Sequence, residues 1–363
     1  QLKIISQKLL WNPAKVKEAL IDNNLRVKIQ DVPIPTPGPG QLLMRTIVSG
    51  TNPKDWKMPK LWAPQASPSN YGDDLSGYIE AVGEDVLGFN KGDRVAAFHE
   101  MGAPHGSYAE YSIAWAHSVF HLPTRITFEE AATIPLAAMT AALGLYQRLG
   151  LPLPWSTTTA PLPLVIYGGA TTVGSFAIKL AALSNIHPII AIAGNGTPYV
   201  NTLLDKSKGD MVIDYRQGET HILEKIKEAA GDNPIIYALD TVSEMNTLRT
   251  IDRALVPSKG KIANLLPSSP ENKLSSELLF TMVGTVHASK PTKPWPVLGD
   301  REFGTLFFSF FGRGLQEGWF HGNPYEVRTG GLDALGQVLG DLEAGKNSAK
   351  KYLLKIAETK GNM

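Results

Sequence analysis

The sequence of 363 residues contains no cysteine. Disulfide bonds, thiolate nucleophiles and every cysteine-ligated zinc site are therefore excluded. It also lacks an excess of charge, because 35 Lys and Arg residues balance 34 Asp and Glu residues to a formal net charge of +1. A net charge this small predicts no strong electrostatic attraction to nucleic acid or to a membrane surface.

Long apolar runs are missing as well. None approaches the roughly 18 residues that a membrane-spanning helix needs, and the N-terminus lacks the continuous apolar core of a secretory signal. With no signal and no disulfides, we expect a cytoplasmic protein. The length is enough for two domains of ordinary size.

The chain changes its pattern twice. From about Lys28 to Leu122, short apolar runs alternate with Gly, Pro and Asp turn signals, which predicts a β-rich domain. A helical segment begins near Phe128. From Leu164 to Val286 strands and helices alternate, which is typical of a doubly wound parallel sheet. The remainder has one amphipathic helix and a final strand, and we expect this short tail to complete the first domain.

The stretch "VIYGGATTVGSF" contains a degraded glycine motif between a strand and a helix. Gly168 can serve as the first glycine, for the tight turn, and Gly174 as the third, for close helix–strand packing. Thr171 takes the middle place, and its hydroxyl and that of Thr172 could donate to a phosphate at the helix N-terminus. An ordinary strand–turn–helix is the alternative.

An acidic residue about 20 positions beyond the glycines normally binds the ribose 2′-hydroxyl of NAD. None occurs between Tyr167 and Asp205. Since an acid would repel a 2′-phosphate, its absence favours NADPH over NADH. The candidates for binding that phosphate are Asn195, Thr197, Tyr199, Lys206 and Lys208.

Several segments together carry a family resemblance. "SGTNPKDWK", "YGDDLSGYIEAVGEDVLGFNKGDRVAAF" and "GSYAEY" resemble the catalytic domain of medium-chain dehydrogenases/reductases, and the glycine loop with "VIDYR" resembles their nucleotide domain. The chain is most similar to the zinc-free branch of quinone oxidoreductases and fungal trans-acting enoyl reductases of polyketide pathways. The resemblance implies a GroES-like domain over residues 1–130, completed by 290–363, and a Rossmann domain over 131–289.

Zinc-dependent relatives place a Cys where this chain has Asn52 and a His where it has Asp73. Without those ligands the usual tetrahedral zinc centre is excluded, and we expect no metal. The spacing of four nearby histidines matches no known pattern of metal ligands, so we interpret them as surface or core residues: His99, His105, His117 and His121.

Two residues are candidates for the chemistry. Lys57 ends the "NPKDWK" motif, and the resemblance places it near the nicotinamide, as ribose ligand, electrophile or proton source. Thr140 lies in the segment that the family brings beside the cofactor. The alternatives are a solvated lysine and a threonine bonded to its own helical turn. Asn52 and Asp55 are turn formers that fix the loop, and a catalytic role for Asp73 and Asp74 is a minority alternative.

The resemblance also implies further residues of the cleft that binds the cofactor. The further cofactor contacts that it implies are Lys54, Asp55, Val173, Tyr215, Leu265, Leu266, Ser348 and Ala349. Aromatic residues that could form the substrate pocket, or simply core, are Trp56, Trp62, Trp295, Phe307 and Phe308. Dimeric members of the family pair edge strands in the region that corresponds to Thr285 to Gly299. The prolines and lysines of this segment disfavour strand pairing, so we expect a monomer.

We therefore expect an NADPH-dependent reductase of an activated carbon–carbon double bond, free or carrier-bound, and specifically an enoyl reductase acting in trans on a polyketide synthase. One alternative is a quinone or small-enone reductase. Another is a cofactor-binding member of the family with little turnover, because fold does not fix function.

Overall fold

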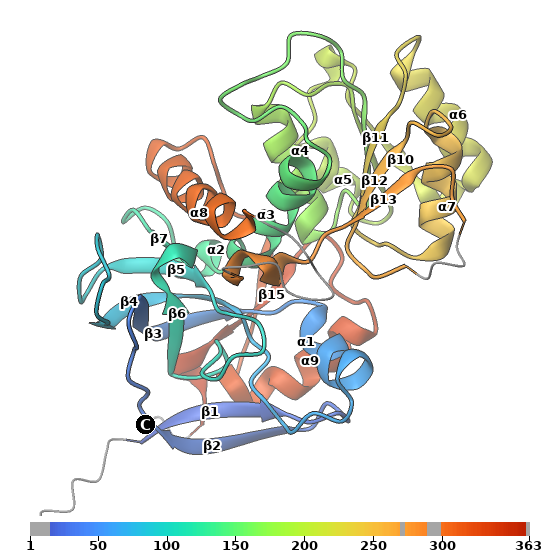
Figure 1. Ribbon diagram of the computed structural model, residues 1–363. Coiled ribbons are helices and arrows are strands. Elements are labelled where there is room, and N and C mark those ends of the chain that lie inside the picture. Colours follow the sequence, from blue (N-terminus) through green and yellow to red (C-terminus); the bar gives the residue numbers. More distant parts are fainter. Residues whose placement is uncertain (1–14, 269–272, 289–298, 361–363) are drawn as a thin grey trace, which may run out of the picture.

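Two large β-sheets organise the chain, whose computed structural model describes residues 15–268, 273–288 and 299–360 (Figure 1). A seven-stranded, mostly antiparallel sheet lies in the lower part of the view, and a six-stranded parallel sheet lies at the upper right. This mixed architecture confirms the α/β fold class that the alternation of strands and helices predicts.

The strand β3 (Gln41–Gly50) is the centre of the first sheet, because it pairs with β4, β6 and β15. The other strands of this sheet are β4 (Asp74–Val82), β5 (Arg94–Phe98), β6 (Tyr111–Trp115), β7 (Val119–His121), β14 (Tyr325–Arg328) and β15 (Lys351–Lys355). The C-terminal segment thus adds two strands to a sheet formed by N-terminal residues. A separate hairpin of β1 (Lys15–Ile21) and β2 (Val27–Pro33) starts the β-rich region earlier than Lys28.

The second sheet has the strand order β10-β9-β8-β11-β12-β13, and all its pairs are parallel. Its strands are β8 (Leu164–Tyr167), β9 (Ile189–Ala193), β10 (Met211–Asp214), β11 (Tyr237–Asp240), β12 (Lys261–Asn264) and β13 (Glu277–Phe280). The first five coincide with the segments predicted as strands from the sequence, "LVIYGG", "PIIAIAG", "MVIDY", "IIYALD" and "KIANLL". The edge strand β13, with the sequence ELLF, was not among the predicted strands; it is only four residues long, and none of its residues is fully buried.

Helices cover both faces of the parallel sheet. Leu164 and Ile166 of β8 pack with α4 (Thr172–Leu183) and α3 (Pro135–Ala142), whereas Val165 packs with α6 (Glu219–Ala230) and α7 (Met245–Ala254). This alternation follows from the two-residue period of a strand. The remaining α-helices of the described residues are α1 (Lys54–Lys57), α2 (Phe128–Ala131), α5 (Thr197–Asn201), α8 (Asp300–Glu317) and α9 (Leu335–Glu343).

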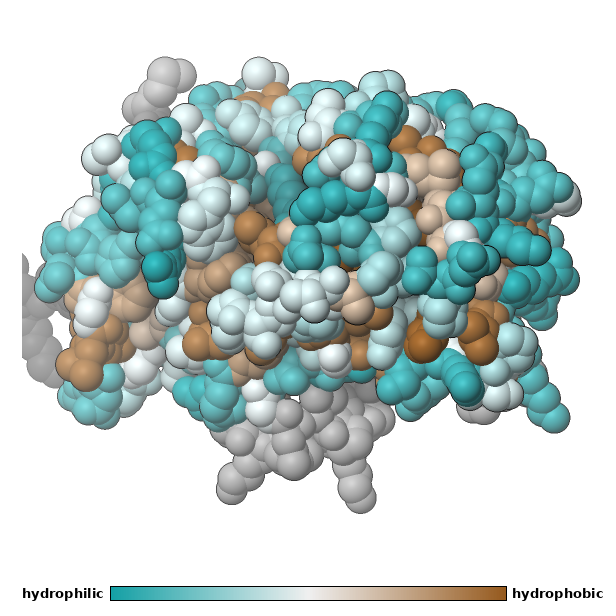
Figure 2. Space-filling view, turned by 90° about the horizontal axis from the view of Figure 1, so that it is seen from above, coloured by the Kyte–Doolittle hydropathy of each residue, from teal (hydrophilic) through white to brown (hydrophobic). Residues whose placement is uncertain are grey.

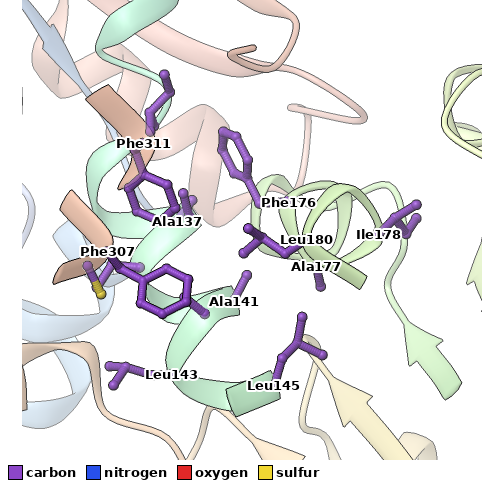
Figure 3. Close-up of a cluster of buried hydrophobic side chains, with 14 of the residues drawn as sticks. Ala137, Ala141, Leu143, Leu145, Phe176, Ala177, Ile178, Leu180, Phe307 and Phe311 are labelled. Carbon is purple, nitrogen blue, oxygen red and sulfur yellow. The ribbon is translucent and has the colours of Figure 1, made fainter. Parts of the chain in front are cut away.

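The largest apolar cluster joins α3, α4 and α8 (Figure 3). Phe307 of α8 is fully buried, with its ring 4.3 Å from that of Phe303 and 5.3 Å from that of Tyr146. Phe308 is also fully buried, between Phe98 and Phe120. Phe307 and Phe308 therefore do not form a substrate pocket; both rings are packed in the hydrophobic core, which was the alternative.

The surface is mixed in character. Figure 2 shows one face on which hydrophilic residues dominate and hydrophobic residues appear in separate areas between them. Among the residues that the structure describes, no helix is both long and apolar enough to cross a membrane.

Truncating Phe307 tests the core assignment. We expect Phe307→Ala to lower the free energy of unfolding by about 3–5 kcal/mol, because it removes a fully buried ring and leaves a cavity. Its neighbour Leu306 is 52% exposed, so Leu306→Ala should change stability by less than about 0.5 kcal/mol. Urea denaturation of both variants measures the difference, and equal midpoints would contradict the assignment.

Candidate active site

A cavity of about 830 Å³ opens where the carboxyl ends of β8, β9 and β12 meet the N-terminal part of the chain. Its walls come from the loop after β3, the glycine loop, the ends of these parallel strands and the segment that leads into β15. Ligands of open α/β sheets bind in the crevice outside the carboxyl ends of the strands. The cavity is therefore the candidate site for both a dinucleotide and a substrate.

The glycine loop forms one end of the cavity. Gly168 has a φ of +80°, and a Cβ added to it would lie 2.3 Å from the Thr241 hydroxyl. A Cβ on Gly174 would lie 2.2 Å from the Gly168 carbonyl oxygen, so only glycine fits at either position. The loop thus brings the N-terminus of the 12-residue helix α4 to the cavity wall, where Thr172 and Val173 line it. This arrangement fits a dinucleotide phosphate.

The two threonines of the loop have different roles. The Thr171 hydroxyl accepts a hydrogen bond from the backbone N–H of Gly174 at 2.9 Å and lies 2.9 Å from the Thr241 hydroxyl. Thr171 is therefore the N-cap of α4, and its predicted donation to phosphate needs correction, because the hydroxyl already bonds within the loop. The Thr172 hydroxyl has no partner among the described residues, which leaves it as the donor at the wall.

The loops after β9 and β10 form another part of the cavity wall. Tyr215 packs against Gly194, where a Cβ would lie 2.6 Å from the tyrosine ring. Asn195 also lines the cavity, and its side-chain oxygen accepts a hydrogen bond from Arg216 at 2.5 Å. Arg216 was not among the predicted site residues, although a basic residue directly after Tyr215 was a usable signal. Its guanidinium is held by the Asp214 carboxylate, whose pKa the hydrogen bonds from Arg216 lower to about 2.

Four other residues predicted around the 2′-phosphate do not line the cavity. Thr197 begins α5, and the Tyr199 hydroxyl donates to the Asn323 side chain at 3.0 Å. Lys208 donates to Asn185 at 2.9 Å, and Lys206 belongs to the same exposed turn. The four side chains therefore lie outside the cavity wall, and the two lysines belong to a turn beyond α5.

The start of the "NPKDWK" motif is fixed by buried charges. Asp55 is fully buried, and it accepts hydrogen bonds from the Asn52 backbone N–H at 2.7 Å and from the Tyr108 hydroxyl at 2.6 Å. Lys54 forms ion pairs with Asp55 at 2.9 Å and Asp73 at 2.5 Å. Burial disfavours its charge, but the two carboxylates outweigh this and raise the pKa of Lys54. Asp55 is thus absent from the cavity wall, which corrects its predicted cofactor contact, and it holds the loop as expected for a turn former.

Lys57 and Thr140 both line the cavity. Lys57 forms no ion pair within the described residues, and desolvation lowers the pKa of its ammonium group. The Thr140 hydroxyl donates to the Leu136 carbonyl at 2.7 Å. Its proton is therefore used inside the helix, as in the alternative role, and only its oxygen lone pairs face a ligand.

Apolar side chains form the remaining wall. This part of the lining contains Met58, Trp62, Met101, Leu136, Ala137, Phe280, Met282 and Val283. The residues Leu265, Leu266, Ser348 and Ala349 also line the cavity. Trp56 instead packs against the cluster around Tyr71 and α9, and Trp295 lies outside the described residues.

The histidines stand apart from the cavity. His99 is buried and contacts Asp73 at 3.0 Å and the Pro104 carbonyl at 3.0 Å. His117 contacts the Val286 carbonyl, and His121 contacts Asp93. Residues 15–268, 273–288 and 299–360 contain no group of three His, Cys, Asp or Glu side chains placed to hold a metal ion.

Known proteins share this architecture. Residues 38–124 match the alcohol dehydrogenase GroES-like domain. The chain is 44% identical over 319 residues to the trans-enoyl reductase fsr4 of Gibberella fujikuroi, covering 87% of this chain and 91% of that protein. It is 31% identical to the trans-enoyl reductase ACTTS2 of Alternaria alternata, covering 93% and 98%. The crystal structure of CurK enoyl reductase has a TM-score of 0.74 at 16% identity, covering 94% and 99%, and shares the fold.

The fold, the cavity and these matches define an oxidoreductase of the medium-chain dehydrogenase/reductase superfamily, with a site for a nicotinamide cofactor. Within it, the chain belongs to the group that contains the fungal trans-enoyl reductases. The resemblance seen in the sequence is thereby confirmed.

The different roles of the threonines predict different mutant behaviour. Thr172→Val should weaken dinucleotide binding about tenfold or more, because a hydrogen bond to a charged group contributes about 1.5–3 kcal/mol. Thr171→Val should instead lower stability by about 1 kcal/mol through loss of the helix cap. Fluorescence titration and thermal unfolding of both variants test this, and a larger affinity loss in Thr171→Val would contradict it.

Proposed function

We propose that the protein is an NADPH-dependent enoyl reductase that acts in trans on an acyl chain of a polyketide pathway. The observation that carries the proposal is one cavity with a phosphate-binding helix end, Lys57 and an apolar, methionine-rich wall. Trans-enoyl reductases that are 44% and 31% identical over most of the chain support it.

The residues suited to binding the cofactor lie in the loops that follow strands of the parallel sheet. The helix N-terminus with Thr172 suits the pyrophosphate, and Tyr215 suits the adenosine. Leu265, directly after β12, and Thr140 also line the cavity, whereas Ala349 lies against the turn after β9, where a Cβ on Gly196 would be 3.0 Å from the Cβ of Ala349. A bound nicotinamide would supply the hydride, while this chain supplies orientation and electrostatics. The proposed domains are the GroES-like residues 1–130 with 290–363 and the Rossmann residues 131–289.

The substrate side must accept a double bond conjugated to a carbonyl. Hydride addition at the β carbon moves the π electrons toward the carbonyl oxygen, and the α carbon then takes up a proton. Met58, Met101 and Met282 offer an adaptable apolar wall for the rest of an acyl chain. The donor set favours chemistry without zinc, because Asn52, Asp73 and Asp74 are already bonded to side chains.

NADPH rather than NADH is proposed because no acid follows β9, and the acid that ends β10, Asp214, is paired with the cation Arg216. Arg216 does not itself line the cavity, but it bonds both Asn195, which does, and Asp214, so its guanidinium is held next to the end of the cavity where we propose the 2′-phosphate. A monomeric state and a cytoplasmic location are proposed from the sequence. The monomer prediction rests on the segment from Thr285 to Gly299, and part of that segment lies outside the described residues.

A substrate panel tests the function. We expect the protein to oxidise NADPH with an enoyl thioester, such as a crotonyl or longer 2-enoyl N-acetylcysteamine, and to form the saturated product. Turnover with quinones or small enones but no enoyl thioester would indicate the quinone reductase alternative. Tight NADPH binding with no turnover on any compound would indicate a non-catalytic family member.

Lys57 should be required for turnover. Lys57→Met should lower kcat about 100-fold, the usual contribution of a positioned acid or electrophile. Lys60 lies in the following turn but pairs with Glu343 outside the cavity, so Lys60→Met is a matched control and should retain activity. Because burial lowers the pKa of Lys57, wild-type activity should fall on the alkaline side at a lower pH than an ordinary lysine would give. Equal rates in the two variants would remove Lys57 from the mechanism.

Arg216 should set the cofactor preference. Arg216→Ala should raise the Kd of NADPH about tenfold, because a charge-assisted hydrogen bond to phosphate contributes more than about 1.4 kcal/mol. The Kd of NADH should stay unchanged. Lys206→Ala, on the exposed turn away from the cavity, is the control. A parallel loss for both cofactors would show that Arg216 has only a structural role.

A further inference from the structure

The side-chain amide of Asn52 is held at both ends. Its nitrogen donates to Asp74 Oδ2 at 2.8 Å, and its oxygen accepts from Lys351 Nζ at 3.2 Å. Its backbone N–H donates to Asp55. The residue is 4% exposed and lines the cavity, so neither rotation nor an amide flip is available to it.

The partners of Asn52 are themselves fixed. Lys351 is 2% exposed and forms an ion pair with Asp74, which is fully buried. The second carboxylate oxygen of Asp74 accepts from the Leu136 backbone N–H at 2.7 Å. Both oxygens of Asp74 are thus occupied, and its negative charge is compensated.

One proton of this arrangement remains unused. The Asn52 amide nitrogen carries two protons, and only one has an acceptor among the described residues. Thr140 on the same wall has its own proton bonded to Leu136. Lys57 is only half-buried and is not held by an ion pair to a described residue. Asn52 is therefore the neutral donor whose position the fold determines most completely.

We propose that Asn52 donates its free N–H to the substrate carbonyl oxygen, on which negative charge develops, and that Lys351 and Asp74 are positioning residues for that amide. The inference rests on the proposed enoyl reduction. Donors fixed before the reaction stabilise such a charge without reorganisation. The Lys351 ammonium also polarises the amide through its oxygen, which strengthens donation from the nitrogen. The amide occupies the position at which zinc-dependent relatives place a cysteine.

The first test separates catalysis from binding. Asn52→Ala should lower kcat with an enoyl thioester about 10²–10³-fold, the usual effect of losing one oxyanion donor. The Kd of NADPH should remain within about twofold of wild type. An unchanged kcat, or a loss confined to cofactor affinity, would overturn the proposal. If the wild-type protein reduces no enoyl thioester, the proposed function fails instead, so the two failures are distinguishable.

A spectroscopic test does not depend on turnover. A cinnamoyl thioester bound to the wild-type protein should absorb at longer wavelength than in water, because donation to its carbonyl polarises the conjugated system. The Asn52→Ala variant should bind the same compound with most of that red shift lost. An equal shift in both proteins would overturn the proposal.

The positioning role needs variants that keep buried charge balanced. Lys351→Met alone leaves the Asp74 carboxylate unpaired, which destabilises the fold, so the double variant Lys351→Met/Asp74→Asn is used. It should lose most of kcat and the red shift while it retains a cooperative thermal transition. Lys350 pairs with Glu326 outside the cavity, and Lys350→Met is the control that should match wild type. A double variant with wild-type kcat, or with weakened NADPH binding as its main defect, would overturn the role.

Discussion

The carboxylate of Asp74 joins three distant parts of the chain at the cavity. Through its two oxygens it binds Asn52 after β3, Lys351 at the start of β15 and the backbone at the N-terminus of α3. A buried carboxylate is tolerated only where such partners compensate it. Its position therefore requires the C-terminal strand to return to the first sheet, and that return closes one wall of the cavity.

The parallel sheet imposes the second constraint. Its strands end together, so the loops after β8, β9 and β12 meet at one edge and can bind one extended ligand. Gly168 and Gly174 let the first of these loops turn sharply into α4. The phosphate-binding end is thus set by backbone geometry, whereas the opposite end is set by buried charges. The proposed transfer of hydride takes place between these two rigid regions.

The sequence predicted the elements with strong local signals. Five of the six parallel strands were found because their residues are apolar runs, and the glycine loop because its turn admits no side chain. Residues placed by tertiary contacts were harder to predict. Thr171 and Thr172 look equivalent in the sequence, but only the structure shows which one caps the helix. The positions of Lys351 and Asp55 depend on partners 299 and 53 residues away in the chain, Asn52 and Tyr108, and no local pattern encodes them.

The central claim is hydride delivery to the β carbon of a conjugated carbonyl compound, with side chains and no metal stabilising the developing charge. The most direct measurement uses NADPH with deuterium at both C4 positions of the dihydronicotinamide, chelator-treated protein and an enoyl thioester. We expect a saturated product with one deuterium on the β carbon and none on the α carbon. Product without deuterium at the β carbon, or turnover that returns only when zinc is added, would contradict it.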